Sequence, residues 1–502
     1  MSTEISCVLA MMLVLAPGLP LGYAITRSAP LALVVAPLVT ALTGTAAIVI
    51  MLLLGGSLRA WLPALFLAQY ALLLARHTGA LSRWQHRLPH RLRPVWRRQR
   101  PERVPTSSPA DVAWVTLPIV PPFLDALMPP AMWDSNSIWW LHAAYFTHGA
   151  DFARAALASP ALVFSHPDYP PFASAPVSVV WSVFDGYRLY PAQAVSALVT
   201  FSAIALLAYA VRAVTSGAPK LLSRLAGAAT GLAAWACAPY AVATGMSDHL
   251  WSAAFVAAAL LLLIGHGWLD RPAVPVLLLS AVALTKNEGL VMVLVLTAAG
   301  TLRYRRELRR VIWPLWAPAA AGLFWGVLAR HFGAVSDVTG DPRIGPFLAG
   351  DEQVWSRFPP TVAALWGQVG TVTTGALIVA VLGAAVLRGR RRGLGLGSDA
   401  WLWGLFALYA VILVTNYLTH ANGIEWYLAT SADRVSLPFA LLACASAACW
   451  AVVAASRGRG SGTEHTTADP PADITEPRAT EPQATEPHTA TRRPRNGHRP
   501  PG

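Results

Sequence analysis

Short polar clusters that combine carboxylates with isolated cations stand at the ends of apolar segments in this 502-residue chain. Their sequences are WDSNSIW at 133–139, HPDYPPF at 166–172, SDHLW at 247–251, TKNEG at 285–289 and TSADRVSLP at 430–438. A carboxylate held near a hydroxyl can act as a general base. A cation can neutralise a phosphate that leaves in the same reaction. These residue types therefore suit the transfer of a group from a lipid phosphate to a hydroxyl.

Asp134 is the first candidate for the base. It lies between Trp133 and the hydroxyl and amide side chains of Ser135 and Asn136. A carboxylate at a membrane interface is costly to desolvate, so it is solvated, paired or functional. Aspartate also favours the N-cap of a helix, and this structural role stays open beside the catalytic one.

Two further clusters offer polar side chains for substrate contact. In HPDYPPF, His166, Asp168 and Tyr169 precede two prolines, which stiffen the backbone that presents them. A structural turn is the alternative there. In SDHLW, Asp248 and His249 stand at the start of an apolar segment, where helix capping is the alternative.

Lys286 is a candidate phosphate ligand in TKNEG, between two short apolar runs. Only Lys220 and Lys286 are lysines among the 38 basic residues. An ionisable group at such depth marks a functional polar site or a salt bridge, and a Lys286–Glu288 pair is the structural alternative. An ammonium group is a compact partner for phosphate.

The segment 419–440 contains the second candidate phosphate ligand, Arg434, together with His420. Arginine offers a planar fork of donors that matches a phosphate or pyrophosphate. A salt bridge to Asp433 or Glu425 is the structural alternative.

The elements that must position these clusters are apolar. The composition is 55% hydrophobic and 13% charged, and the mean hydropathy is +0.48, which excludes an ordinary soluble domain. The sequence predicts an all-α polytopic membrane protein with about 13 transmembrane helices. The expected segments are 5–26, 31–54, 58–75, 111–130, 190–211, 225–243, 249–267, 272–285, 289–302, 311–329, 370–387, 399–417 and 435–455.

Loops between these segments are alternately arginine-rich and acid-rich, which predicts the orientation. By the positive-inside rule, the arginine-rich loops face the cytoplasm, the N-terminus and the polar clusters lie outside, and the C-terminus lies inside. The net charge of +13 then gathers at the cytoplasmic edge, where anionic lipid headgroups rather than nucleic acid are the expected counterpart. The four cysteines show no paired spacing in an external loop, so neither a disulfide framework nor a metal site is implied.

The chain divides into four parts. Residues 1–75 are expected to form three transmembrane helices, 76–110 a basic cytoplasmic linker, 111–455 the main transmembrane core, and 456–502 a disordered cytoplasmic tail with a repeated TEP motif.

A large first external loop, 131–189, is the longest in the core. Aromatic and aliphatic residues recur there at near-helical spacing, which predicts a helix lying in the outer interface. This helix would serve either anchoring or substrate contact. The recurring residues are Trp133, Ile138, Trp139, Leu141 and Tyr145.

Through the order of these clusters, residues 111–455 resemble the GT-C superfamily of membrane glycosyltransferases, in the branch of the bacterial protein O-mannosyltransferases and the aminoarabinose transferase. The resemblance implies that Asp134, in the first external loop, is the catalytic base, and that Lys286 and Arg434 bind the lipid phosphate. The remaining cluster residues become substrate-binding candidates: His166, Asp168, Tyr169, Asp248, His249, Glu288 and His420.

Two features depart from the family pattern. Many relatives carry paired acids in the first loop, whereas serine follows Asp134, so a divalent cation is left open and no other cofactor is assigned. The three N-terminal helices lie outside the family's minimal core.

The resemblance implies an inverting glycosyltransferase on the outer face of the cell membrane. A polyprenyl-phosphate sugar would be the donor, and a hydroxyl of a glycan, a glycolipid or a protein the acceptor. The alternatives are a transporter or flippase of a lipid-linked sugar, and a non-catalytic membrane scaffold. No internal repeat is evident, which disfavours a transporter.

Overall fold

The computed structural model describes residues 2–78, 108–121, 132–184, 186–237, 239–265, 272–304, 312–335, 343–386, 396–420 and 423–457. Within these ranges all regular structure is helical. Most of the predicted linker, at 79–107, and the predicted tail from 458 onward lie outside the described residues.

The N-terminal half contains α1 (Thr3–Leu15), α2 (Leu19–Thr26), α3 (Ala29–Leu54), α4 (Leu58–His77), α6 (Pro109–Thr116), η2 (Leu117–Ile119), the π-helical turn η3 (Ser135–Trp140), α8 (Leu141–Thr147), α9 (Ala150–Leu157), η4 (Pro160–Ser165), α10 (Ala175–Val183), α11 (Leu189–Val214), α12 (Lys220–Ala236) and α13 (Pro239–Ala243).

The C-terminal half contains α14 (Asp248–Leu263), α15 (Ala273–Ala283), α16 (Asn287–Arg303), α17 (Ile312–His331), α18 (Ile344–Ala349), α19 (Glu352–Trp355), α20 (Phe358–Val386), α21 (Leu396–Thr419), α22 (Ile424–Val435) and α23 (Leu437–Arg457).

Six helical stretches are long and apolar enough to cross a membrane: 29–54, 58–77, 189–214, 352–383, 399–419 and 424–456. The bent pair α1 and α2, with an angle of 44° between them, would make a seventh. α14 and α15 are apolar but shorter. The chain is therefore a helical protein suited to several membrane passes, and the expected number of 13 spans remains a prediction.

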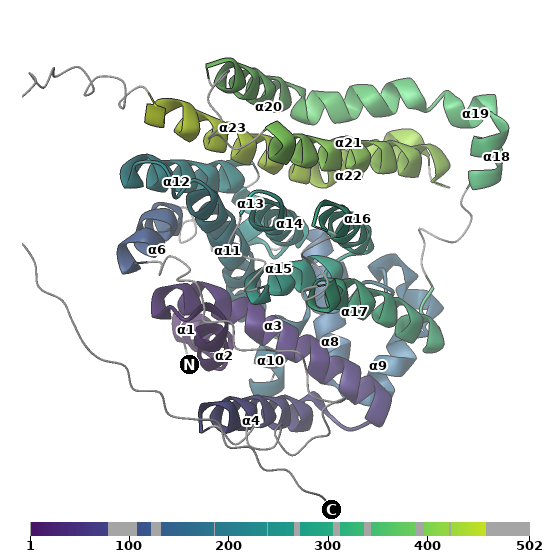
Figure 1. The fold of residues 1–502 in the computed structure, drawn as a ribbon. Helices are drawn as coiled ribbons and strands as arrows, with labels where there is room; N and C mark the ends of the chain where they lie inside the picture. Colours follow the sequence, from purple (N-terminus) through teal and green to yellow (C-terminus); the bar gives the residue numbers. More distant parts are fainter. Residues whose placement is uncertain are drawn as a thin grey trace, which may run out of the picture. The chain divides into compact units, whose positions relative to one another are not determined.

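The centre of the described bundle is formed by α11 and α14, which pack against each other. Every residue of α14 is buried, and its run of alanines between larger side chains allows neighbours to approach from all sides. Figure 1 shows α20, α21, α22 and α23 as one layer, which contacts α12 and α14 through α23.

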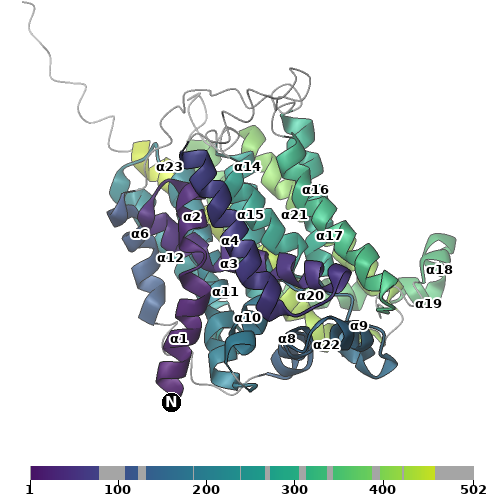
Figure 2. The same ribbon diagram turned by 90° about the horizontal axis from the view of Figure 1, so that it is seen from below.

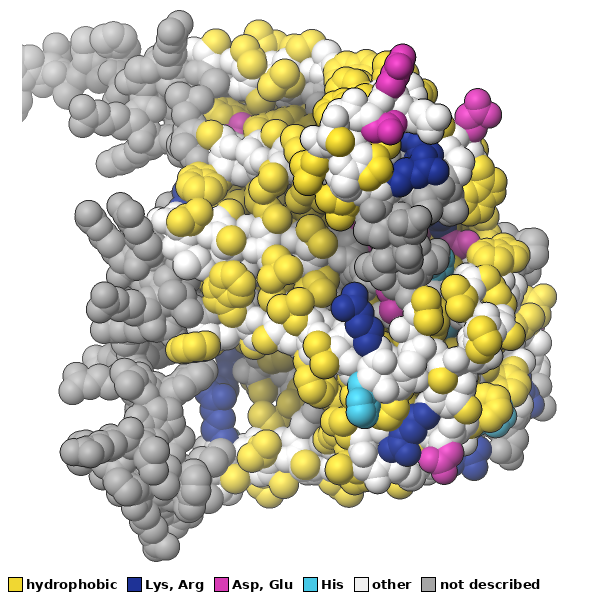
Figure 3. All heavy atoms as spheres, turned by 90° about the vertical axis from the view of Figure 1, so that its right-hand side faces the viewer, with side chains coloured by type: hydrophobic (Ala, Val, Ile, Leu, Met, Phe, Trp, Pro, Cys, Tyr) yellow, Lys and Arg dark blue, Asp and Glu magenta, His cyan; other side chains and the backbone are white. Residues whose placement is uncertain are grey.

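Elements of the segment 131–189 lie at one end of the long helices. Figure 2 shows α8, α9 and α22 there, on the side where α18 and α19 also lie. Figure 3 shows one face of the molecule. Among the coloured residues, most charged and histidine side chains lie in the right-hand half of this view, next to a broad band of hydrophobic side chains. This distribution suits a membrane belt with a polar face at one end.

The expected interfacial helix in the first loop is wrong for most of its residues. Ile138, Trp139 and Tyr145 are buried against protein, and only Trp133 among the aromatic residues of this pattern is largely exposed. The near-helical spacing that suggested contact with the bilayer instead directs these side chains into the protein core.

Candidate functional site

Asp134 and Arg434 form an ion pair between the segment 131–189 and the last turn of α22. The Nη1 group of Arg434 donates to Oδ2 of Asp134, and 24% and 20% of the two side chains are exposed. Asp134 has helical backbone angles and its side chain makes no capping hydrogen bond, so the N-cap interpretation is wrong.

Asp433 and Glu425, the partners in the structural alternative for Arg434, are not its ion-pair partners among the described residues. The carboxylate of Asp433 accepts a hydrogen bond from the backbone N–H of Arg434 at 2.8 Å, and Glu425 is exposed at the start of α22. The guanidinium group instead reaches a carboxylate 300 residues away in sequence.

Lys286 and Asp248 form a second, more deeply buried ion pair. The Nζ–Oδ1 distance is 2.7 Å, and only 8% and 4% of the two side chains are exposed. Within the described residues, Lys286 is thus paired with Asp248 and not with Glu288, the partner in the structural alternative. The N-cap residue of α14, Ser247, makes no side-chain capping bond, so the polar start of this helix serves the ion pair rather than a cap.

Two aromatic rings lie close to the Lys286 ammonium group. Its Nζ atom lies 5.9 Å from the ring centroids of both Trp139 and Tyr169, and these two rings stack at 5.8 Å. The His166 ring also stacks on Tyr169, with the ring centroids 4.7 Å apart. Cation–π attraction to these rings therefore helps to stabilise the buried ammonium group.

The HPDYPPF segment is fastened to the turn that carries Lys286. Asn287 donates to Oδ2 of Asp168 at 2.7 Å, and the N–H of Phe172 donates to the carbonyl of Leu284 at 2.9 Å. Trp325 donates to the carbonyl of Asp168 at 2.9 Å. The segment is thus a buried structural turn, and it presents Tyr169 to the ammonium group.

Gly289 lets α16 begin close to α15. A Cβ atom at this position would collide with the backbone carbonyl of Val282. The close approach fixes the turn from 284 to 287 and so the starting point of the Lys286 side chain. A glycine in TKNEG is therefore a packing requirement.

The two ion pairs are electrically connected. Arg434 interacts with Asp248 as well as with Asp134, so two carboxylates and two cations act on one another. All five polar clusters of the sequence meet around these four groups. The arrangement can hold an anion only if the anion shares or takes over the cations from their carboxylates.

Glu288 is two residues from Lys286, and His420 is a further candidate substrate-binding residue. Oε2 of Glu288 is buried with no hydrogen-bond partner among the described residues, and the carboxylate interacts electrostatically with Tyr409 and Tyr417. His420, at the end of α21, stacks on Tyr427 at 4.1 Å. Glu288 belongs to the first turn of α16, and His420 follows the last residue of α21.

Sequence inspection missed two contributors to this geometry. Asn287 lies within TKNEG and was not a candidate site residue. Its hydrogen bond to Asp168 links two clusters that are 119 residues apart. Tyr417 lies inside an apolar helix, and its hydroxyl is hydrogen-bonded to that of Ser431 on α22 at 2.7 Å. The sequence contained one signal for each residue: Asn287 is an amide next to a lysine, and Tyr417 is a polar aromatic residue within an apolar segment.

His142 connects α8 to the segment before HPDYPPF by a hydrogen bond. It is fully buried in α8, and its Nε2 lies 2.8 Å from the carbonyl oxygen of Ser165, which precedes HPDYPPF. Burial lowers the pKa of His142 to about 3, so the ring is neutral and Nε2 carries the donated proton.

Acidification is expected to destabilise the protein through His142. Its pKa is depressed in the folded state, so the unfolded chain binds the proton first, and stability is lost as pH falls from about 6.5 towards 3. The measurement is the melting temperature of the detergent-solubilised protein from pH 7 to pH 4.5. His142→Gln should start lower and fall less steeply; an equal slope in both proteins would contradict this assignment.

Within the described residues, no group of three or more His, Cys, Asp and Glu side chains is arranged to hold a metal ion. The suggested divalent cation therefore has no assigned ligands. Comparisons with protein-family models, with curated proteins and with solved structures found no match for this chain.

Proposed function

We propose that this chain is a GT-C-like membrane glycosyltransferase that moves a sugar from a polyprenyl-phosphate donor to an acceptor hydroxyl. The acceptor belongs to a glycan, a glycolipid or a protein. The observation that supports this most is the joining of two carboxylate–cation pairs, Asp134–Arg434 and Asp248–Lys286, at the meeting point of all five polar clusters.

The two cations suit the donor phosphate. Arg434 offers a fork of N–H groups for two phosphate oxygens, and its Nε is buried without a hydrogen-bond partner among the described residues. Lys286 adds a compact charge close to two aromatic rings. Together they stabilise the negative charge that develops on the leaving phosphate.

Asp134 is the better placed carboxylate for proton transfer. It is partly exposed, whereas Asp248 is buried and committed to Lys286. Asp134 takes the proton of the acceptor hydroxyl while the hydroxyl oxygen bonds to the anomeric carbon. The bond from that carbon to the phosphate oxygen breaks, and its electron pair leaves with polyprenyl phosphate. A single displacement inverts the anomeric centre.

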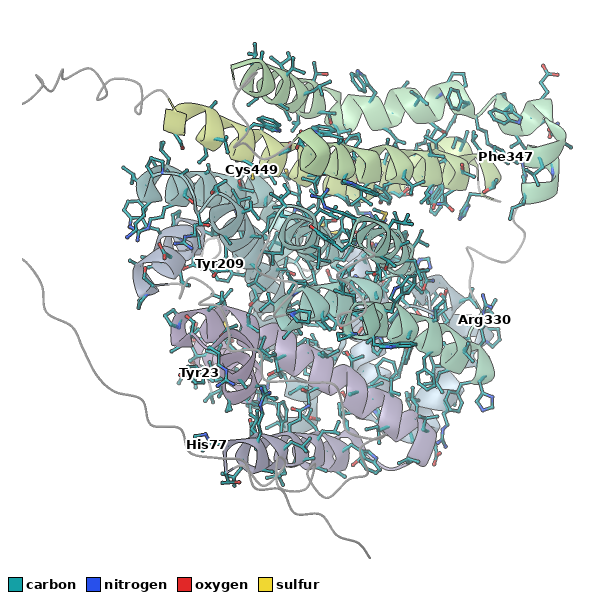
Figure 4. All side chains as sticks on the ribbon, viewed as in Figure 1. Tyr23, His77, Tyr209, Arg330, Phe347 and Cys449 are labelled. Atoms are coloured by element: carbon teal, nitrogen blue, oxygen red, sulfur yellow. The ribbon has the colours of Figure 1, made fainter. Side chains whose placement is uncertain are left out.

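The external face of the cell membrane is the proposed location of this chemistry. In Figure 4, Arg330 at the end of α17 and Phe347 on α18 lie towards the right-hand end of the helices, and His77 at the end of α4 lies at the left. The end that carries Arg330 and Phe347 is proposed to face outside, because the arginine-rich sequence after His77 is expected to face the cytoplasm.

Cysteine-accessibility labelling tests this orientation. Single cysteines introduced near residues 150 and 345 should react with an impermeant reagent in intact cells, and cysteines near 90 and 305 should react only after permeabilisation. The opposite labelling pattern would place the candidate site at the cytoplasmic face and overturn the proposed donor side.

The function itself is tested with purified protein in proteoliposomes and a panel of radiolabelled polyprenyl-phosphate sugars. A glycosyltransferase releases the label from the lipid when an acceptor is present. A transporter or flippase moves the labelled lipid between leaflets and leaves the sugar attached.

A further inference from the structure

His249 is a buried polar side chain without a hydrogen-bond partner. Only 2% of it is exposed, and neither Nδ1 nor Nε2 has a partner among the described residues. It is the second residue of α14 and follows Asp248, which holds Lys286. A buried imidazole with one donor and one acceptor unsatisfied is costly, and native proteins keep such groups where a ligand or water completes them.

Further unsatisfied polar atoms belong to the same segments. They belong to three buried hydroxyl groups. Ser247 is the N-cap residue of α14, Ser252 is the fifth residue of that helix, and Ser135 follows Asp134. None of them has a hydrogen-bond partner within the described ranges. His249 and Ser252 are three residues apart and so share one face of the helix.

The turn before α14 lies against η3. Gly245 has φ of 85°, and a Cβ atom there would come within 2.9 Å of the Trp140 ring. This contact brings the segment that carries Ser247 next to the segment that carries Ser135. The unsatisfied atoms therefore come from neighbouring elements around the ion pairs.

The chemistry of these atoms indicates a hydroxyl-bearing ligand. A sugar hydroxyl both donates and accepts, so it satisfies an imidazole, a serine hydroxyl and the buried oxygen of Glu288. A phosphate only accepts and would be repelled by Glu288, so it belongs with Lys286 and Arg434. An apolar chain would leave every one of these atoms unsatisfied.

We propose that His249, with Ser135, Ser247, Ser252 and Glu288, forms the subsite for the sugar ring of the donor, and that His249 determines how tightly this sugar is held. The inference rests on the proposed function and extends it by separating two parts of the site. The cations bind the phosphate of the lipid, and the α14 subsite binds the monosaccharide.

Binding to proteoliposomes of two probes tests this division. The probes are polyprenyl phosphate alone and the most tightly bound member of a panel of polyprenyl-phosphate monosaccharides. His249→Leu should weaken binding of the sugar-bearing lipid by about tenfold or more, the scale of lost hydrogen bonds, and leave binding of bare polyprenyl phosphate unchanged. His249→Gln, which keeps a donor and an acceptor, should recover part of the loss and serves if the leucine variant does not fold.

His142→Leu is the matched control, because it removes another buried histidine whose partner is the Ser165 carbonyl. It should lower thermal stability and keep the ratio of the two affinities. If the His249 variants lower both affinities equally, or neither, the subsite is overturned, and a buried water or a packing role explains the imidazole. If the wild-type protein binds neither lipid, the proposed function itself fails.

Discussion

Replacing Asp134 with asparagine is expected to lower sugar transfer by about 100-fold or more, the usual scale of a lost general base, while donor binding survives. Asparagine keeps the shape of the side chain but lacks the basic oxygen. Because the substitution also releases Arg434 from its ion pair, the donor phosphate should bind as tightly as before or more tightly. Single-turnover transfer and donor binding in proteoliposomes measure the two effects separately.

Asp433→Asn is the matched control for this experiment. Asp433 adjoins Arg434 and is exposed, and its carboxylate accepts only the backbone N–H of Arg434 in the contacts described above. Its replacement should leave transfer nearly unchanged. Near-wild-type turnover in Asp134→Asn would eliminate Asp134 as the base and move the assignment to Asp168, then Asp248.

Lys286→Gln is expected to impair both folding and donor binding, since the substitution leaves the Asp248 carboxylate buried without its cation. Removing one partner of a buried ion pair typically costs about 3–5 kcal/mol of unfolding free energy. Thermal unfolding in detergent should show this loss. The single variant alone cannot separate a structural role from a role in phosphate binding.

The double variant Lys286→Gln with Asp248→Asn makes that separation. It replaces the charged pair by two neutral amides, so stability should largely return. Donor affinity should stay reduced, because a charge-assisted bond to phosphate worth about 1.5–3 kcal/mol is still missing. A stable double variant with wild-type donor affinity would remove Lys286 from the phosphate site.

Periodicity and charge alternation were sufficient to predict the helical class and several helices closely. The predicted segments 31–54 and 58–75 correspond to α3 and α4. The bend near the start of the chain was not predicted. The expected segment 5–26 forms two helices separated by a bend at Ala16–Gly18. Local hydropathy is continuous there and contains no signal for the bend beyond Pro17 and Gly18.

The sequence did not predict which carboxylate pairs with which cation. Lys286 has an acid two residues away, and Arg434 has one next to it, so local bridges were the structural alternatives to phosphate binding. The structure instead pairs each cation with a carboxylate from a distant segment. Such partners are set by how α14, α16, η3 and α22 pack, and no spacing along the chain encodes that packing.

The burial of the aromatic side chains in the segment 131–189 was also not predicted from the sequence. Trp139 and Tyr145 recur at helical spacing, which a membrane interface and a protein core require equally. The deciding fact is that α10 packs against α8, and neighbouring elements cover this aromatic face. The identity of the residues around the site could therefore be predicted from sequence, and their enclosure could not.

Transfer of label from lipid to acceptor tests the central claim most directly. Proteoliposomes containing the wild-type protein, a radiolabelled polyprenyl-phosphate sugar panel and a crude envelope acceptor fraction are compared with the same vesicles containing Asp134→Asn. For one donor, the wild-type protein should release polyprenyl phosphate and place the label on the acceptor, and the variant should bind that donor without transfer. Label that stays on the lipid for every donor, with a folded protein and acceptor present, would contradict the account.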